Sequence, residues 1–438
     1  MLLLLLLLLY FLSHIQALQR GVFSILSQNL ALLQTHLEDP VYFRTLLLLL
    51  FNTLQKYLFH QSSQWHTLTS KQFEYYNRGH MQSSLDSLQK DTTEKDGLET
   101  LIYLLQHLLQ KLPDIVVSLS GSSVEACPLA YFCSMLSDRL RAEPYLFDAY
   151  LNLLTAIANT SAQSAEAVYR FIDKAPSEHV NWNLMLHSLN EGDRLLQTDV
   201  AQRGLLDADV TGFIAILGLL TAVLRHGAPC PTIRSNVQVN TVSLCIHLLH
   251  QPVHIVLKAR LCSLLACLAS DDSFARVILQ QLEYGQMLTA DPNTGLRYEL
   301  ERVETTVQAY PLTSSFLALL LALLRTLSPR VVLASNAFPV ILQYVLHGVF
   351  LPNDRRTFLF SRTGEKPLLS SLCLQFLTPF LALFHELATT TLPEEDRILQ
   401  QRLSSLVSEL LSNHEVFHQV GKDDCNDYEY DKFILVMK

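Results

Sequence analysis

The sequence predicts an all-α protein, an irregular α-solenoid in which antiparallel helix pairs stack in series. Three observations support this fold class. Apolar residues recur at helical spacing in one segment after another, short polar or proline-marked turns separate the segments, and no window shows sustained strand-like alternation. Charged residues make up only 17% of the 438 residues, and 14 are glycine, which indicates helices with extensive buried surface.

Residues 96–113, DGLETLIYLLQHLLQKLP, show the helical pattern most clearly. The apolar positions of this segment are Leu98, Leu101, Ile102, Leu104, Leu105, Leu108, Leu109 and Leu112. They form the stripe of an amphipathic helix. Asp96 is placed to cap the first amide groups, Glu99 to bond back to the start, and Pro113 to end the helix. The predicted cap, the apolar face and the predicted end therefore all indicate one helix.

The same pattern recurs further along the chain. TVSLCIHLLHQ ends before Pro252, and we expect the next helix to begin at Pro252, where the missing N–H costs nothing. Another helix follows, with Asp272 as its predicted N-cap. Short helices in series, without strands between them, are typical of HEAT and armadillo arrays. Because no fixed period of about 40 residues recurs, the predicted array is irregular.

The chain divides by composition into four parts. We expect leading solenoid helices over 1–60, a flexible polar loop over 61–97, the α-solenoid proper over 98–420, and an acidic, disordered tail over 421–438. The loop is rich in Ser, Thr, Gln and charged residues, and the tail abandons the helical pattern. The solenoid therefore accounts for most of the chain.

Several leucine-rich runs raise the alternative of a polytopic membrane protein. Residues 2–12, 210–224 and 312–324 are all shorter than the ~20 apolar residues that a membrane-spanning helix needs. Residues 367–384 are longer, but polar side chains and Pro379 interrupt them. Helices stacked in a solenoid bury such faces against their neighbours without lipid. We therefore expect no transmembrane span.

Charge and cysteine usage narrow the function classes. The net charge is −9, so no overall basic field exists to attract nucleic acid, and we expect no direct nucleic-acid binding. The 8 cysteines include no Cys-x-x-Cys pair and lack the density of a secreted disulfide scaffold. The sequence therefore predicts reduced, mostly buried thiols in a cytosolic or nuclear protein.

No motif in the sequence indicates catalysis or a metal site. His247, His250 and His254 lie close together, but Pro252 interrupts their helix and no acidic residue or thiol completes a ligand set. We interpret them as surface or capping histidines. Phosphate-binding glycine loops, nucleophile elbows and paired carboxylates are also missing from the sequence. We therefore predict no catalytic, cofactor-binding or metal-binding residues, no cofactor and no enzymatic activity.

The most distinctive stretch is RYELERVETTVQAYPLTSSFLALL, residues 297–320. Pro311 should force Tyr310 out of helical geometry, and Thr313 or Ser314 can cap the helix that follows. Phe316 is placed to anchor that helix to the core. The predicted structural hinge consists of Tyr310, Pro311, Leu312, Thr313 and Phe316. No partner-binding residue can be assigned in the same way.

The order of these segments resembles the large scaffold nucleoporins of the nuclear pore inner ring, the nucleoporin two-hundred-five family (one-hundred-ninety-two in fungi). In that family a glutamate-rich helix likewise leads into Tyr-Pro-Leu-Thr, and Glu299, Glu301 and Glu304 stand at matching places. PYLFDAYLNLLTAIAN upstream and FPVILQYVLHGVFLPNDRRTF downstream extend the resemblance to about 144–387. The related nucleoporin one-hundred-eighty-eight family shares the architecture.

The resemblance implies a structural scaffold of the nuclear pore complex, located in the nucleus at the nuclear envelope and supporting nucleocytoplasmic transport. Its implied partners are other nucleoporins, namely linker nucleoporins of the ninety-three and fifty-three or thirty-five types. Family members are several times longer, so we expect a truncated isoform or an incomplete gene model. The alternative function is that of a generic HEAT-like adaptor in the cytosol.

Overall fold

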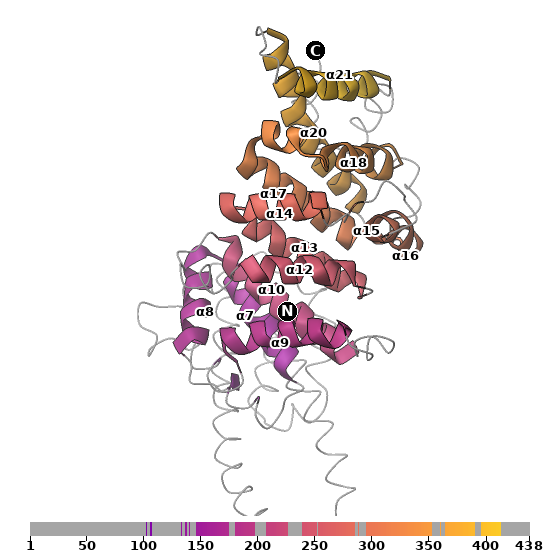
Figure 1. Cartoon of the computed structure of the whole chain (residues 1–438). Helices are drawn as coiled ribbons and strands as arrows, with labels where there is room; N and C mark the ends of the chain where they lie inside the picture. The colour runs from indigo at the N-terminus through magenta and orange to yellow at the C-terminus, as the bar shows by residue number, and fades with distance from the viewer. Residues whose placement is uncertain are drawn as a thin grey trace, which may run out of the picture. The chain divides into compact units, whose positions relative to one another are not determined.

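The computed structural model describes a helical chain (Figure 1). The residues described are 146–174, 180–197, 207–226, 239–251, 253–284, 295–352, 364–389 and 396–412, with the single residues 102, 106, 133, 136, 137, 140, 288 and 360. No strand occurs among these residues. The predicted parts 1–60, 61–97 and 421–438 lie outside them, as does most of the predicted helix 96–113. The chain divides into two compact units, Met1–Met185 and Leu186–Lys438.

In the first unit, helix α7 (Phe147–Ala158) packs against helix α8 (Ala162–Lys174). Helix α9 (Trp182–Gln197) begins in this unit. The ring of Tyr169 stacks on that of Trp182 with 5.7 Å between centroids, and Trp182 Nε1 donates a hydrogen bond to the Tyr169 carbonyl at 3.4 Å. The aromatic pair thereby ties α8 to the start of α9.

The second unit is a stack of helices. Its elements are α10 (Asp207–Arg225), α12 (Val239–His250), α13 (Ile255–Leu268), α14 (Asp272–Tyr284), α15 (Gly295–Tyr298), the π-helix η5 (Glu299–Val303), α16 (Glu304–Val307), α17 (Pro311–Ala334), α18 (Phe338–Gln343), the π-helix η6 (Tyr344–Phe350), α20 (Glu365–Thr389) and α21 (Asp396–Ser412). Helices α10, α13, α17 and α20 pack in that order, and α12 packs on α14 beside them. The predicted fold class, an all-α solenoid, is confirmed.

The contact between α13 and α17 is the most extensive among the described elements. Ser263 Oγ donates to Ser315 Oγ at 3.3 Å near the middle of α13, and Thr326 Oγ1 donates to the carbonyl of Ala269 at 2.7 Å at its end. Later residues of one helix thus meet later residues of the other, so the two helices run in the same direction. Equivalent helices of successive pairs are expected to run this way in a solenoid.

Two described helices are long and apolar enough to cross a membrane by length and composition: Pro311–Ala334 and Glu365–Leu383. The first extends beyond the apolar run 312–324, and it consists of two helical segments joined by a kink at Ser328, which has non-helical geometry. In each, 56% of the most apolar window is buried inside the structure. Core helices of soluble proteins pass the same test, so these two helices are weak evidence for a membrane span.

Helix α13 begins later than predicted. Its first residue is Ile255, three positions after Pro252, and the residue before it, His254, acts as the N-cap. His254 Nδ1 accepts a hydrogen bond from the backbone N–H of Val256 at 3.3 Å. Because the cap needs an acceptor that bonds back to the first amides, the imidazole sets the start of the helix. The interpretation of His254 as a capping histidine is confirmed.

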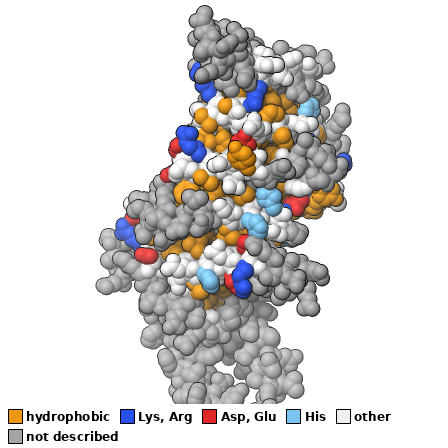
Figure 2. Space-filling model, in the orientation of Figure 1, with side chains coloured by type: hydrophobic (Ala, Val, Ile, Leu, Met, Phe, Trp, Pro, Cys, Tyr) orange, Lys and Arg blue, Asp and Glu red, His pale blue; other side chains and the backbone are white. Residues whose placement is uncertain are grey.

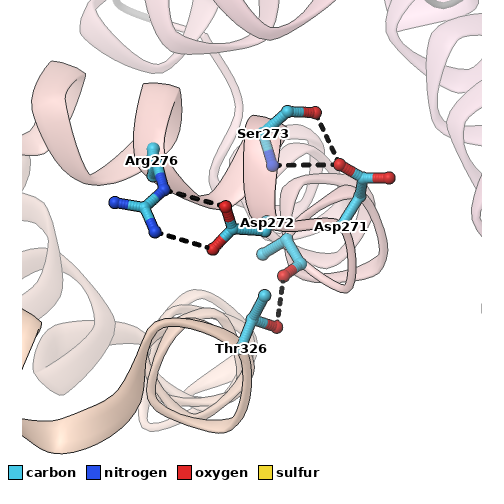
Figure 3. Close-up of polar contacts among 6 residues, drawn as sticks. Asp271, Asp272, Ser273, Arg276 and Thr326 are labelled. Carbon is cyan, nitrogen blue, oxygen red and sulfur yellow. Dashed lines mark hydrogen bonds and ion pairs between the residues drawn. The ribbon is translucent and has the colours of Figure 1, made fainter.

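Helix α14 begins at Asp272 but is capped one residue earlier than predicted (Figure 3). Asp271 Oδ1 accepts hydrogen bonds from the backbone N–H of Ser273 at 3.0 Å and from its hydroxyl at 2.5 Å. The carboxylate of Asp272 pairs with Arg276 at 2.8 Å. With two adjacent aspartates, the one outside the helix caps it, and the one inside is spaced for an i,i+4 ion pair.

Candidate functional site: the α17 junction

We call Glu299–Phe316, the segment that leads into α17, the α17 junction. Its central contact is made by Glu304, whose carboxylate is fully buried at 0% exposure. This carboxylate accepts hydrogen bonds from the backbone N–H of Leu312 at 2.6 Å, the N–H of Thr313 at 2.9 Å and the Thr313 hydroxyl at 2.7 Å. These are among the amides that a helix start leaves unpaired. Glu304 therefore caps α17 from outside it, whereas the sequence predicted Thr313 or Ser314.

The backbone between α16 and α17 turns at two residues. Gln308, at the end of α16, has a left-handed conformation with φ of 60°. Tyr310 precedes proline and lies outside helical geometry, with φ of −120° and ψ of 46°. Pro311 is the first residue of α17, where its missing N–H leaves no donor to satisfy. The predicted displacement of Tyr310 from the helix is therefore observed.

Aromatic rings enclose this turn. Tyr310 is 1% exposed, and its ring centroid lies 5.0 Å from that of Phe360. Phe316 is buried and meets the ring of Tyr344 edge-on at 5.8 Å, while the Tyr344 hydroxyl donates to Thr313 Oγ1 at 3.3 Å. Of the predicted hinge residues Tyr310, Pro311, Leu312, Thr313 and Phe316, the structure bonds Leu312 and Thr313 to Glu304 and packs Tyr310 and Phe316 against other aromatic rings. Their role as a hinge stays a prediction.

Each of the three glutamates of the junction contacts a different helix. Glu299 accepts from Lys258 Nζ of α13 at 2.7 Å, and Glu301 accepts from Arg297 Nε of α15 at 2.7 Å. Glu304 caps α17. Lys258 is only 2% exposed, so its charge depends on Glu299 for a partner. Lys258 was not identified from the sequence. The one indication of a buried ion pair was its position as a lysine within the apolar segment IVLKARLCSLL.

Burial governs the electrostatics of Glu304. It raises the pKa of this carboxyl to about 7, although the hydrogen bonds from Thr313 and Leu312 act to lower it. The negative charge of Glu365, at the start of α20, also contributes to this rise in the pKa. The negative charge of Glu304 therefore costs free energy in the folded chain. The hydrogen bonds from the amides of Leu312 and Thr313 offset part of this cost.

The two π-helices meet at this junction. A Cβ atom added at Gly348 of η6 would lie 2.9 Å from Glu301 Oε1 of η5 and 2.8 Å from the Tyr344 ring. Only glycine fits this approach without displacing a neighbour. π-helical segments are frequent where a helix is distorted for function. Here they bring the Glu301 carboxylate close to the backbone of η6.

The other candidate groups make structural contacts. His247 Nδ1 lies 2.6 Å from Asp193 Oδ1, and His250 Nδ1 lies 2.8 Å from the carbonyl of Ile246. Within the described part of the chain, no group of three or more His, Cys, Asp or Glu residues is placed to hold a metal ion. Burial raises the pKa of the Cys245 thiol to about 12, which keeps it protonated and unreactive at neutral pH.

The described surface mixes apolar and polar side chains. On the face in Figure 2, hydrophobic side chains lie along the stacked helices, and Lys and Arg side chains occur in small separate groups. The exposed large apolar side chains are Leu184, Tyr284, Tyr298, Val307, Val331 and Leu368. Tyr284 is the most exposed at 73%, followed by Val307 at 61%.

Comparison with known proteins places this helical stack in a family. The sequence matches the family described as "Nuclear pore complex scaffold, nucleoporins 186/192/205" over residues 132–420. Human "Nuclear pore complex protein Nup205" is 26% identical over 270 residues, which cover 54% of this chain and 13% of the relative. Drosophila melanogaster "Nuclear pore complex protein Nup205" is 24% identical over 328 residues, which cover 64% of this chain and 15% of the relative.

The chain thus matches only a small part of each relative's length, 13% and 15%. Residues 132–420 include the α17 junction and every element from α7 to α21. Because the family match extends over more than half of the 438 residues, the chain belongs to the nuclear pore complex scaffold family of nucleoporins 186/192/205.

Proposed function

We propose that this chain is a structural segment of the nuclear pore complex scaffold, located in the inner ring at the nuclear envelope, where it supports nucleocytoplasmic transport. The observation that carries the proposal is the family match over residues 132–420, which coincides with the stacked helices. The proposed role is structural and not catalytic. It agrees with a junction whose buried polar groups bond to helix ends.

The proposed partners are linker nucleoporins of the ninety-three and fifty-three or thirty-five types. A stack of helices offers grooves between neighbouring helices, into which an apolar helical or extended segment can bind. Tyrosine side chains are frequent anchors at such interfaces, because they bury a large area at low entropic cost. Tyr284 and Tyr298 are exposed at 73% and 45%. They are available for this purpose.

In this scaffold the α17 junction has the role of a fixed bend. The hinge residues Tyr310 and Pro311 turn the chain, and the Glu304 carboxylate fixes the start of α17 by hydrogen bonds of 2.6 and 2.9 Å to its amides. A scaffold needs its helices held at constant directions so that partner sites keep their spacing. The buried, bonded turn satisfies that need.

Binding of purified linker segments tests this function. The full chain, purified without detergent and immobilised, is incubated with segments of each linker type and with scrambled controls. Retention of a linker segment but not of its scrambled control supports the scaffold role. The variants Tyr284→Ser and Tyr298→Ser form a matched pair that shows which exposed tyrosine contributes.

Two other outcomes identify the alternatives. A folded chain that ignores the linker segments, and binds cytosolic proteins in cells without reaching the nuclear rim, points to the HEAT-like adaptor. A chain recovered only in detergent points to the polytopic membrane protein, whose spans would be α17 and α20. Fluorescent tagging of the full chain distinguishes nuclear-rim from cytosolic location.

A further inference from the structure

We propose that Ser328 is a phosphorylation site for a proline-directed serine/threonine protein kinase. Ser328 lies at a kink inside α17, where its backbone leaves helical geometry with φ of 68° and ψ of 151°. Its side chain is exposed, and Pro329 follows it. Proline disfavours helical geometry in the residue before it, which accounts for the non-helical ψ of 151°, whereas the positive φ of 68° places Ser328 in a region that L residues rarely adopt. The Ser328 side chain is thus exposed at a non-helical position of α17, between exposed Arg325 and exposed Arg330.

The chain contains one Ser-Pro and one Thr-Pro dipeptide, and their surroundings are opposite. Thr378-Pro379 lies inside α20, where Thr378 is 7% exposed. The Thr378 hydroxyl donates to the carbonyl of Leu374 at 2.7 Å. A kinase must reach the hydroxyl and bind the flanking backbone. The buried Thr378 is therefore inaccessible to a kinase in the folded chain, whereas the exposed Ser328 is accessible. Both sites have a hydroxyl residue followed by proline, but they differ in their exposure to solvent.

Anchors on both sides confine the opening that a kinase needs. Before the kink, Thr326 Oγ1 bonds to the carbonyl of Ala269, which fixes α17 to the end of α13 (Figure 3). After it, Arg402 Nη1 of α21 donates to the carbonyls of Leu333 at 2.5 Å and Ser335 at 2.9 Å. The residues between these anchors can open locally while the helices around them stay packed.

The reaction needs MgATP as the phosphoryl donor. The Ser328 Oγ attacks the γ-phosphorus, a new Oγ–P bond forms, the bond to the β,γ-bridging oxygen breaks, and ADP leaves. The hydroxyl proton passes to the catalytic aspartate of the kinase. The product carries a charge of about −1.5 to −2 at neutral pH. Arg325 and Arg330 are both exposed beside the site and supply positive charge close to the phosphate.

The test uses the full chain and a proline-directed kinase chosen because it phosphorylates a synthetic peptide of residues 322–334. The native chain is incubated with this kinase and MgATP, and phosphate at positions 328 and 378 is quantified over time by mass spectrometry. We expect Ser328 to be modified at least tenfold faster than Thr378 in the native chain. A peptide of residues 372–384 measures the reactivity of Thr378 outside the fold.

The controls make the proposal refutable. Ser328→Ala should remove the fast phosphorylation, and Pro329→Ala should slow it at least tenfold while Ser328 remains. Circular dichroism of each variant confirms that the helices are retained. The proposal is overturned if Thr378 reacts as fast as Ser328 in the native chain. It is also overturned if Pro329→Ala leaves the rate unchanged, or if native Ser328 stays unmodified under conditions that modify its peptide.

Discussion

Two residues that precede a proline leave helical geometry, one directly before helix α17 and one at the kink within it, and their surroundings differ. At its start, Tyr310 is 1% exposed, and Glu304 bonds to the first amides of the helix. At its kink, Ser328 has a positive φ of 68° and lies exposed beside Pro329. The same local signal thus yields an enclosed, bonded turn in one place and an open, strained one in the other.

The difference shows that the surroundings of an X-Pro pair decide what it does. A residue held in a sparsely populated backbone region costs about 1–3 kcal/mol. At the helix start, Tyr310 has a negative φ of −120°, and hydrogen bonds to a buried carboxylate fix the helix direction. At the kink, exposure leaves the backbone able to move. We therefore expect changes near Glu304 to reduce stability strongly and changes at Ser328 to act weakly.

The largest effect is expected at Lys258, which links the enclosed junction to α13. Replacing Lys258 by Ala leaves the Glu299 carboxylate without its partner at 2.7 Å. Removing one member of a fully buried ion pair typically costs about 3–5 kcal/mol. Because the Glu299 side chain left behind is 23% exposed, we expect the free energy of unfolding to fall by the lower end of this range, about 3 kcal/mol. Urea unfolding monitored by circular dichroism measures it. The double variant Lys258→Met with Glu299→Gln should recover most of the loss, and a single-variant loss below about 1 kcal/mol would contradict the pairing.

A loss of similar size is expected for Glu304→Ala. This change leaves the buried donors of Leu312 and Thr313 without their acceptor. Each buried unsatisfied donor costs about 1–3 kcal/mol, and removal of a costly buried carboxylate offsets part of this, so we expect a loss of about 3 kcal/mol. Glu304→Gln keeps one acceptor oxygen for the two Thr313 donors but turns its NH2 donor toward the Leu312 N–H, so it should lose part of the same free energy in the same urea titration. A loss below about 1 kcal/mol for Glu304→Ala would show that the cap does not stabilise the helix start.

The titration of Glu304 gives a smaller effect with a definite sign. Its pKa is about 7 in the folded chain against an ordinary value of 4.5, so the folded state binds the proton more tightly than the unfolded state. The free energy of unfolding should therefore fall as pH rises from 5 to 7, by about 2 kcal/mol, and level off above that range. Glu304→Gln cannot titrate and should lack this slope. A wild-type slope of the opposite sign between pH 5 and 7, relative to Gln, would refute the assignment.

Local signals could be predicted from the sequence, and long-range partners could not. Proline at 311 was enough to predict that Tyr310 leaves the helix, since this constraint acts between neighbours. The cap of α17 was predicted in the wrong place, because Glu304 bonds to Thr313 across nine positions and a non-helical turn. Lys258 was missed, because its partner Glu299 is 41 positions away. Helical periodicity does not indicate which residues form such long-range pairs.

The smallest effect is expected at the kink itself. Replacing Ser328 by Gly removes the Cβ that makes its φ of 68° and ψ of 151° unfavourable. We expect the free energy of unfolding to rise by about 1 kcal/mol, because the relieved strain exceeds the added entropy of the unfolded chain. Thermal unfolding at constant pH measures the shift.

Gln308→Gly is the matched control, because Gln308 has φ of 60° and ψ of 27° in the milder left-handed region. Its replacement should stabilise the chain by less than the change at Ser328, about 0.5 kcal/mol or below. If Ser328→Gly destabilises the chain while Gln308→Gly does not, then the kink is held by contacts of the serine side chain and is not a strained, open segment. The contrast between the two proline turns of α17 would then be lost.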